Sequence, residues 1–472
     1  MKTDLIASMK TFFQGHPTIR YIPRSSAEFA TVREVWNCSR PDQPLAIAQP
    51  QSAEDVATLI KFVKSNAIPF SIRSGGHNLE GRALVQDALL IDLRTLDSVA
   101  VAEDLKSATV GGGILQGELI NQLWAKGVAT STGSIPHVGF FGWASYGGYG
   151  PFSSKWGLGV DNIIGATVVD PNGNLIKLEG SDPLLKGIRG AGGVFGVIVD
   201  LTIKVYPAPT LLAGPILFDT SDITTSFTKI NTAYSNLLDA ETIPSQLTLQ
   251  RVSFYSPRGL AFAFLFAWAG TGTEEDLEEG QRWSQKIASL GPAKINMVKP
   301  TTIPEWVSGA GAHVPKAVYG SASTYNLSHI TSKVAEAIGS NLAHLPADAG
   351  AMCTIHQVRG PSAAPQEPGS DSIFGPRQPH FMIEILGYSV GSDKQADSES
   401  WADKFSADVE KAASSSGALL PTSYISLYTS TRSSSSAEWV KKVYGDSATS
   451  LYDLKASFDP DNLFKHTVPS LE

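Results

Sequence analysis

The sequence predicts an α+β protein in which a two-part first domain, made of the N-terminal segment and the C-terminal tail, carries an inserted second domain. Three observations lead to this prediction. The first half alternates short apolar runs with helical patterns. The pattern of predicted strands and helices changes near residue 208, and the C-terminal tail again resembles the first part of the chain. A chain of 472 residues is also too long for one ordinary core. The predicted limits are 1–207 for the first domain, 208–415 for the insertion and 416–472 for the return.

The composition excludes several classes of protein. A net charge of -8 without a run of Lys and Arg argues against a nucleic-acid surface. No apolar run approaches the roughly 18 residues of a membrane-spanning helix. No signal peptide is visible, so we expect a cytoplasmic protein, or a secreted one whose leader has been removed. The sequence leaves open the oligomeric state and whether its two cysteines, Cys38 and Cys353, pair.

The elements of the first part follow from local patterns. Ser52 stands three residues before an acidic residue and a helical apolar pattern, which predicts a capped helix start. The turn sequence Asp-Pro-Asn-Gly at 170–173 predicts a hairpin between the runs on its two sides. The remaining predictions are strands at 45–48, 68–72, 89–93, 107–110, 163–169, 175–177 and 197–205, and a helix at 116–126 ended by Gly127. Such alternation is typical of α/β or α+β packing.

The second part contains longer and more apolar elements. Its predicted strands are 215–220, 246–254, 260–268 and 381–386, and its predicted helices are 222–239, 274–289, 329–342 and 397–416. A loop rich in Pro, Gly and Ser is expected at 359–379.

Clusters of glycine give the first indication of function. At 72–78 a strand runs into Gly75 and Gly76 and then into His77. Glycines allow a backbone to approach a ligand closely and to offer N–H groups to phosphate oxygens. Further clusters occur at 111–113, 133–150 and 190–196, so several loops are expected to converge on one extended, phosphate-bearing ligand. None fits the Rossmann or Walker A pattern, and the motifs of zinc proteases and esterases are absent.

Five segments in order resemble the FAD-linked oxidases of the vanillyl-alcohol oxidase superfamily, in the berberine-bridge-enzyme-like branch. They are Arg-Ser-Gly-Gly-His at 73–77, Gly-Ser-Ile-Pro at 133–136, Lys-Trp-Gly-Leu-Gly-Val-Asp-Asn at 155–162, the glycine-rich 189–197, and Phe-Asp-Pro-Asp-Asn-Leu-Phe at 458–464. The resemblance implies that the two-part domain binds FAD, and that the inserted substrate domain is an antiparallel sheet covered by helices.

The resemblance also implies how the cofactor is held. His77 matches the residue that forms a covalent bond to FAD. Members with a second bond have a cysteine where this chain has Ile135, so a single link is expected. The residues implied to bind the cofactor, besides His77, are Arg73, Ser74, Gly75, Gly76, Gly133, Ser134, Val138, Gly139, Gly142, Gly147, Gly148, Asn162, Gly196, Val197 and Tyr428. His137 is a further histidine close in sequence to this loop, although a lone histidine is more often structural.

Three residues are candidates for the chemistry. Glu384 lies in an apolar strand, where burial is expected to raise its pKa toward that of a useful base. Relatives place a Glu or Gln on the corresponding strand. Tyr149 follows two glycines at a position where relatives have a tyrosine near the flavin, so it is expected to orient a substrate hydroxyl, to assist proton removal or to pack under the ring. Tyr428 ends a segment that departs from the family pattern at Ser426 and Leu427.

The expected activity is that of an oxidase. A hydride leaves a small organic substrate, an alcohol or amine of secondary metabolism, and oxygen then re-oxidises the flavin with release of hydrogen peroxide. Val138 occupies a position where the resemblance associates a small residue with oxygen access, which favours an oxidase over a dehydrogenase. The alternatives are a sugar oxidase, a redox-neutral cyclase and a non-catalytic flavin carrier. The sequence does not name the substrate.

Overall fold

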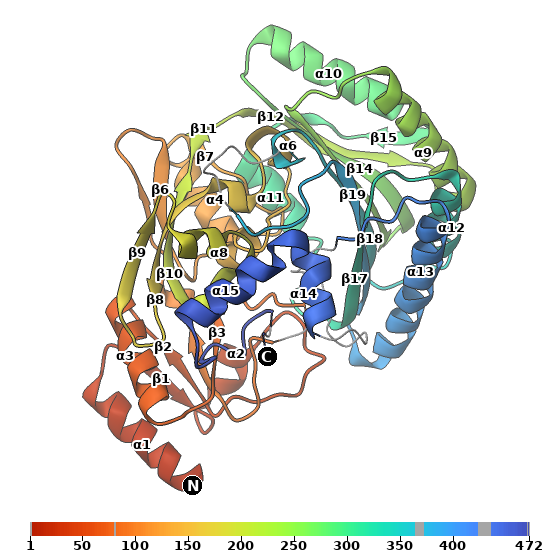
Figure 1. Ribbon diagram of the computed structural model, residues 1–472. Helices are drawn as coiled ribbons and strands as arrows, with labels where there is room; N and C mark the ends of the chain where they lie inside the picture. The colour runs from red at the N-terminus through yellow and green to blue at the C-terminus, as the bar shows by residue number, and fades with distance from the viewer. Residues whose placement is uncertain (1, 80–81, 364–371, 423–435, 470, 472) are drawn as a thin grey trace.

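A computed structural model describes residues 2–79, 82–363, 372–422, 436–469 and 471. The chain forms a mixed helix and sheet structure in two parts, with the N-terminal elements on one side and a large sheet with its helices on the other (Figure 1). This arrangement confirms the predicted α+β class. Among the described residues, no helix is long and apolar enough to cross a membrane. Cys38 and Cys353 both carry free thiols, so they do not pair.

The first part contains two sheets and a short strand pair. A four-stranded sheet has the order β1-β2-β4-β3 and a five-stranded sheet has the order β5-β6-β10-β8-β9, while β11 pairs with β7. The strands are β1 Arg20–Pro23, β2 Ala46–Gln49, β3 Phe70–Arg73, β4 Leu89–Asp92, β5 Val99–Val101, β6 Ser107–Gly111, β7 Val128–Ala129, β8 Ile163–Val169, β9 Leu175–Glu179, β10 Val197–Lys204 and β11 Tyr206–Pro207. Every residue of β2 and β4 is buried, including the polar Gln49 and Asp92 at their ends.

The helices of this part are mostly short. They are α1 Lys2–Gly15, α2 Phe29–Arg33, α3 Ala53–Ser65, α4 Gln116–Trp124, α5 Phe140–Ala144, α6 Ser153–Trp156, α7 Gly159–Asn162 and α8 Pro183–Ala191. The predicted cap of α3 is confirmed, because the Ser52 hydroxyl accepts the N–H of Asp55 at 3.1 Å. Its apolar face, which includes Val56, Leu59 and Ile60, is buried.

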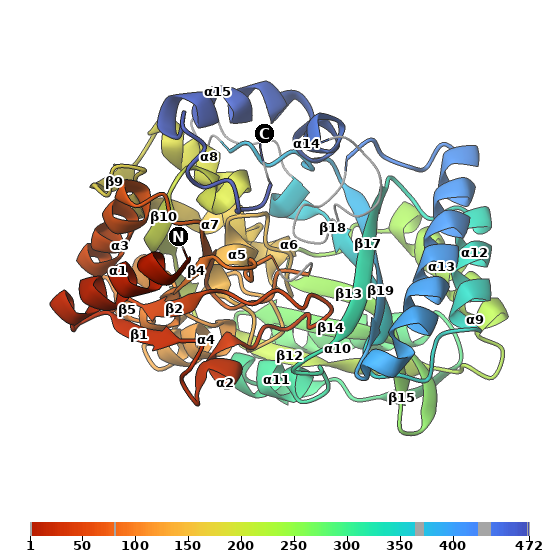
Figure 2. The ribbon, with the colours of Figure 1, turned by 90° about the horizontal axis from the view of Figure 1, so that it is seen from below.

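The second part is built on one eight-stranded antiparallel sheet with the order β15-β12-β14-β13-β18-β19-β17, in which β16 also pairs with β12. The strands are β12 Thr210–Phe218, β13 Leu247–Ser256, β14 Gly259–Gly270, β15 Ala293–Asn296, β16 Lys299–Thr301, β17 Tyr319–Leu327, β18 Ala351–Val358 and β19 His380–Ser389. The helices are α9 Ile223–Ala240, α10 Glu274–Ala288, α11 Ile303–Gly311, α12 Ser332–Leu342 and α13 Gln395–Ser415. The views in Figures 1 and 2 show α9, α12 and α13 outside the sheet, away from the first part.

The C-terminal elements pack onto the first part. Helices α14 Ser436–Tyr444 and α15 Ala448–Phe458 contribute Val440, Tyr444 and Leu451 to the core around β6, β8 and β10. The Lys455 ammonium donates to Asp459 at 2.6 Å and to the carbonyl oxygen of Val194 at 2.9 Å. This packing supports the prediction that the C-terminal tail belongs to the first domain. The domain limits at 207 and 415 stay a prediction.

Candidate active site

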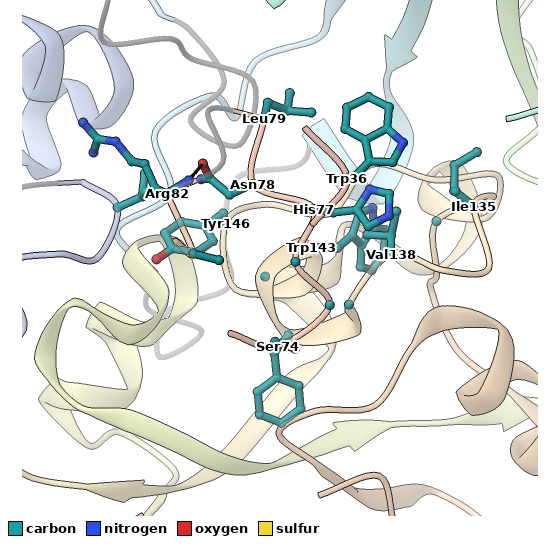
Figure 3. A pocket seen from close by; sticks show the side chains of 18 of the residues that line it. Trp36, Ser74, His77, Asn78, Leu79, Arg82, Ile135, Val138, Trp143 and Tyr146 are labelled. Carbon is teal, nitrogen blue, oxygen red and sulfur yellow. Dashed lines mark hydrogen bonds between the residues drawn. The ribbon is translucent and has the colours of Figure 1, made fainter. Parts of the chain in front are cut away.

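A cavity of about 460 Å³ lies between the loops of the first part and the large sheet (Figure 3). The residues of β18 and β19 on its wall alternate along the chain: 352, 354 and 356 from β18, and 382, 384 and 386 from β19. Alternate side chains of a strand point to opposite faces. The intervening Cys353, Ile355, Ile383 and Ile385 accordingly pack in the helix-covered core. One face of the sheet is therefore core, and the other is cavity wall.

Glycines shape the opposite wall. A Cβ atom on Gly75 would lie 2.1 Å from the backbone nitrogen of Gly139, so these two loops touch through their backbones. A Cβ atom on Gly142 or Gly193, which also line the cavity, would meet nothing within 4 Å. The missing side chains therefore leave room at the backbone for a ligand, which fits a cradle for FAD.

His77 stands in the cavity wall against a second histidine. Its Nε2 lies 2.7 Å from Nδ1 of His137. Its ring stacks on Trp36 with 5.2 Å between centroids, and Figure 3 shows these two side chains next to each other. Burial, and then the neighbouring His137, lower the pKa of His77 to about 3. The ring is therefore neutral at neutral pH and keeps a nitrogen lone pair, which a nucleophile needs.

A buried ion pair anchors the loop that carries His77. The Arg73 guanidinium donates to Asp92 at 2.5 Å and 3.1 Å, and both side chains are fully buried. Gln49 and Arg94 also donate to Asp92. Burial acts to raise the pKa of Asp92, but the hydrogen bonds and charges of Arg94 and Arg73 hold it below its usual value. Arg73 lines the cavity, and its guanidinium group is paired with Asp92, so its charge stabilises the loop.

Glu384 belongs to a polar group on the sheet wall, which Gln250 of β13 extends, since the Nε2 atom of Gln250 lies 3.2 Å from Nε2 of His356. The Glu384 carboxylate accepts from the Thr354 hydroxyl and lies 3.2 Å from Nε2 of His356. Burial acts to raise the pKa of Glu384, but His356 and Thr354 outweigh it, so the pKa lies below its usual value. The expectation of a raised pKa was therefore wrong, because the cross-strand partners of Glu384 cannot be seen in the sequence.

Tyr149 lines the same cavity and has a histidine behind it. Its hydroxyl lies 2.9 Å from Nε2 of His380, and its ring centroid lies 6.0 Å from that of His356. Tyr149 and the Glu384 group therefore occupy the same region of the cavity.

Most of the predicted site residues meet at this cavity. Those that line it are Arg73, Ser74, Gly75, Gly76, His77, Gly133, Ser134, Ile135, Val138, Gly139, Gly142, Tyr149, Gly196, Val197 and Glu384. Gly147, Gly148 and Asn162 do not line it. The Asn162 amide donates to the carbonyl oxygens of Trp156 and Leu158, so it shapes the loop behind the wall. Tyr428 belongs to the segment 423–435, which lies outside the described residues.

Sequence reasoning missed many polar and aromatic residues of the site. Trp36, Thr354 and His356 line the cavity, and His380 contacts Tyr149. The cavity wall also includes Arg82, Trp143, Tyr146, Gln250 and His466. The alternation of residues in 351–358 could have indicated Thr354 and His356, but that strand was not predicted. Among the described residues, no group of three or more His, Cys, Asp or Glu could hold a metal ion.

Comparisons with known proteins identify the family of the chain. The FAD binding domain family matches residues 44–179. The FAD-linked oxidoreductase aurO of Gibberella zeae is 31% identical over 449 residues, which cover 95% of this chain and 85% of that protein.

Solved structures share the fold. The 6-hydroxy-D-nicotine oxidase of Arthrobacter nicotinovorans superposes with a TM-score of 0.79 at 24% identity, over 96% of this chain and 97% of that one. The xylooligosaccharide oxidase of Myceliophthora thermophila has a TM-score of 0.81 at 21% identity, over 96% and 98% of the two chains. The motifs, the FAD cradle and the relative that matches almost the whole chain lead to one conclusion. The chain belongs to the FAD-linked oxidoreductases of the vanillyl-alcohol oxidase superfamily, in the berberine-bridge-enzyme-like branch.

Proposed function

We propose that this FAD-dependent oxidoreductase is an oxidase, and that it removes a hydride from a hydroxyl- or amine-bearing carbon of a mainly apolar small molecule. The observation that carries the proposal is the Glu384–His356–Thr354 group in the same cavity as the glycine cradle and His77. Bound FAD supplies a two-electron acceptor for the hydride, and molecular oxygen takes the electrons on to form hydrogen peroxide.

We infer a single covalent link between FAD and His77. The neutral ring of His77, stacked on Trp36 and held by His137, supports this inference because it offers a nitrogen lone pair in a fixed position. Ile135 lines the cavity at the position of the second-link cysteine. Among the described residues, no cysteine lines the cavity, so no thiol is available there for a second bond.

Glu384 is the proposed proton acceptor. Its lowered pKa keeps it ionised at neutral pH, so it accepts hydrogen bonds and does not donate them. His356 then directs its Nε2 proton at the carboxylate, which fixes the orientation of Glu384. A low pKa makes a carboxylate a weaker base, so its efficiency depends on this fixed position close to the substrate's O–H or N–H group.

The lining favours an apolar substrate over a sugar. Met352, Met382, Leu386, Val314 and Val318 line the same cavity as the polar group. A sugar would bring hydroxyl groups against this wall without partners, which is unfavourable. A molecule with one reacting polar group on an apolar body matches the lining better, as expected for an intermediate of secondary metabolism.

The first test is acid precipitation of the wild type and of the variant His77→Ala. We expect yellow flavin to stay with the wild-type pellet and to be released from the variant. Free flavin from the wild type would contradict the covalent link, and the absence of flavin from both would contradict the assignment of the cradle.

The second test measures peroxide and oxygen consumption with aromatic alcohols, cyclic amines and xylobiose as substrates. We expect stoichiometric peroxide with an alcohol or amine, a product with two hydrogens fewer, and a loss of activity in Glu384→Gln. A product of unchanged oxidation state without peroxide would indicate the redox-neutral cyclase. Turnover of xylobiose alone would indicate a sugar oxidase. Bound FAD that no substrate bleaches would support a carrier.

A further inference from the structure

A buried Lys–Asp pair at the end of α15 lies between two walls of the cavity. Lys455 is in the last turn of this helix and is 7% exposed, while Asp459 follows the helix and is 1% exposed. Their charged groups are 2.6 Å apart. Helix α15 lies against α8 in both ribbon views (Figures 1 and 2). Neither side chain of the pair lines the cavity, so the pair acts on a ligand through the backbone that it holds.

Lys455 holds the glycine-rich wall of the cavity. Its ammonium donates to the carbonyl oxygen of Val194 at 2.9 Å. Gly193 and Gly196, on the two sides of Val194, line the cavity. The position of this wall therefore depends on a side chain from the C-terminal tail.

Asp459 holds a second wall. Its carboxylate accepts the backbone N–H groups of Leu463 at 2.8 Å and of Phe464 at 3.0 Å. The chain then continues into the cavity wall, where residues 466–468 line it. The oxygen of Asp459 that accepts from Phe464 also accepts from Lys455, so one ion pair connects the two walls.

Tyr444 of α14 holds the beginning of the same glycine-rich segment. Its hydroxyl is buried and donates to the carbonyl oxygen of Gly190 at 3.2 Å. The N–H group of Gly190 donates to the carbonyl oxygen of Ser145 at 2.9 Å, and Ser145 lines the cavity. A glycine backbone has many accessible conformations, and Gly190 has a φ of +143°. Contacts from outside the segment are therefore needed to keep it in one conformation.

We propose that Lys455, Asp459 and Tyr444 are positioning residues for FAD, and that docking of helices α14 and α15 onto the first part is thermodynamically coupled to FAD binding. Such coupling is reciprocal. If the docked tail strengthens FAD binding by a given factor, FAD stabilises the docked tail by the same factor. The inference depends on the binding of FAD alone, so its failure is distinguishable from failure of the proposed oxidase activity.

The first test measures FAD affinity in the double variant Lys455→Met and Asp459→Asn. A His77→Ala background makes binding reversible. Methionine fills much of the space of the lysine stem, and asparagine keeps an oxygen for the two backbone N–H groups, so no unpaired charge is left buried. The hydrogen bond to Val194 is lost. We expect FAD to bind about 5- to 150-fold more weakly, the usual range of coupling between two sites.

The matched control changes a Lys–Asp pair of the same spacing in the second part. Lys404 and Asp408 of α13 are also four residues apart, with their charged groups 2.6 Å apart, and neither lines the cavity. Lys404→Met with Asp408→Asn, in the same background, should leave FAD affinity unchanged. Equal affinities of the two double variants would overturn the proposal.

The second test measures the reciprocal effect by amide hydrogen exchange of α15 with and without FAD. We expect FAD to slow this exchange in the His77→Ala protein, and to slow it much less in the double variant at the same FAD saturation. A purely structural role of the pair would make α15 exchange faster in the double variant and leave the effect of FAD unchanged. That result, or an exchange of α15 that FAD does not slow, would overturn the coupling.

A milder substitution keeps the proposal testable if the double variant does not fold. Tyr444→Phe removes one hydroxyl and no charge, so it should weaken FAD binding about 2- to 12-fold, as expected for one hydrogen bond. Tyr452→Phe removes a hydroxyl from the 37% exposed Tyr452 of α15 and serves as its control. Equal FAD affinities of these two variants would contradict the role of the tail in positioning the cofactor.

Discussion

The substitution Gly142→Ala tests the cradle, because it separates the stability of the protein from its affinity for FAD. Gly142 is the central residue of α5, and a Cβ atom there would meet nothing within 4 Å. Alanine is favoured over glycine in a helix by about 0.5–1 kcal/mol, so the FAD-free protein should become slightly more stable. The added methyl group would stand in the cavity. If FAD occupies that space, overpacking of about 1–3 kcal/mol should weaken FAD binding by about 5- to 150-fold.

The chain supplies a matched control in Gly309→Ala. Gly309 lies in helix α11, has the same open surroundings and does not line the cavity. Both substitutions are made in a His77→Ala background, where no covalent bond can mask the affinity. FAD titration and chemical unfolding of the FAD-free proteins are then compared. The reasoning is refuted if Gly142→Ala binds FAD as tightly as Gly309→Ala does.

Further predictions concern the buried charges and the proposed base. Asp92→Asn should lower the free energy of unfolding by about 3–5 kcal/mol, measured with urea, because it leaves the buried Arg73 without its counter-charge. Since folding lowers the pKa of Asp92, its contribution to stability is present above about pH 4 and is lost as the pH falls through the folded pKa; Asp92→Asn should remove this dependence. Asp459→Ala should destabilise the protein by a similar 3–5 kcal/mol, because Lys455 loses its buried partner, and limited proteolysis should then cut first near α15. Glu384→Gln should lower kcat about 10²- to 10⁴-fold with flavin content unchanged; full activity in this variant would exclude Glu384 as the base.

The sequence predicted the features that depend on local chemistry. The cap at Ser52, the hairpin at 170–173 and the glycine loops around His77 were visible because each depends on residues close in the chain. Their convergence on one cavity was expected from the resemblance, and most of the implied residues do line it.

Features that depend on pairing between distant strands were not predicted. Strands β17 and β18 mix small, polar and apolar residues without a strong pattern, and β18 carries Thr354 and His356. The partners of Glu384 are fixed by the register of β18 against β19, in which Thr354 pairs with Glu384. The register between two strands cannot be predicted from the pattern of one sequence. The expected pKa of Glu384 was wrong because this register, and with it the partners of Glu384, was unknown.

The alternation along β18 and β19 has an evolutionary consequence. Residues that contact a ligand and residues that fill the helix-covered core occupy separate positions of the same two strands. Substitutions at 352 and 386 can therefore change which molecules are accepted while the core at 353, 355, 383 and 385 is untouched, whereas Met382 also packs with Tyr149 and Leu158 in a second buried cluster. Such a division lets a lineage explore new substrates at little cost in folding, and it marks positions 352 and 386 as the first to randomise in a library for altered specificity.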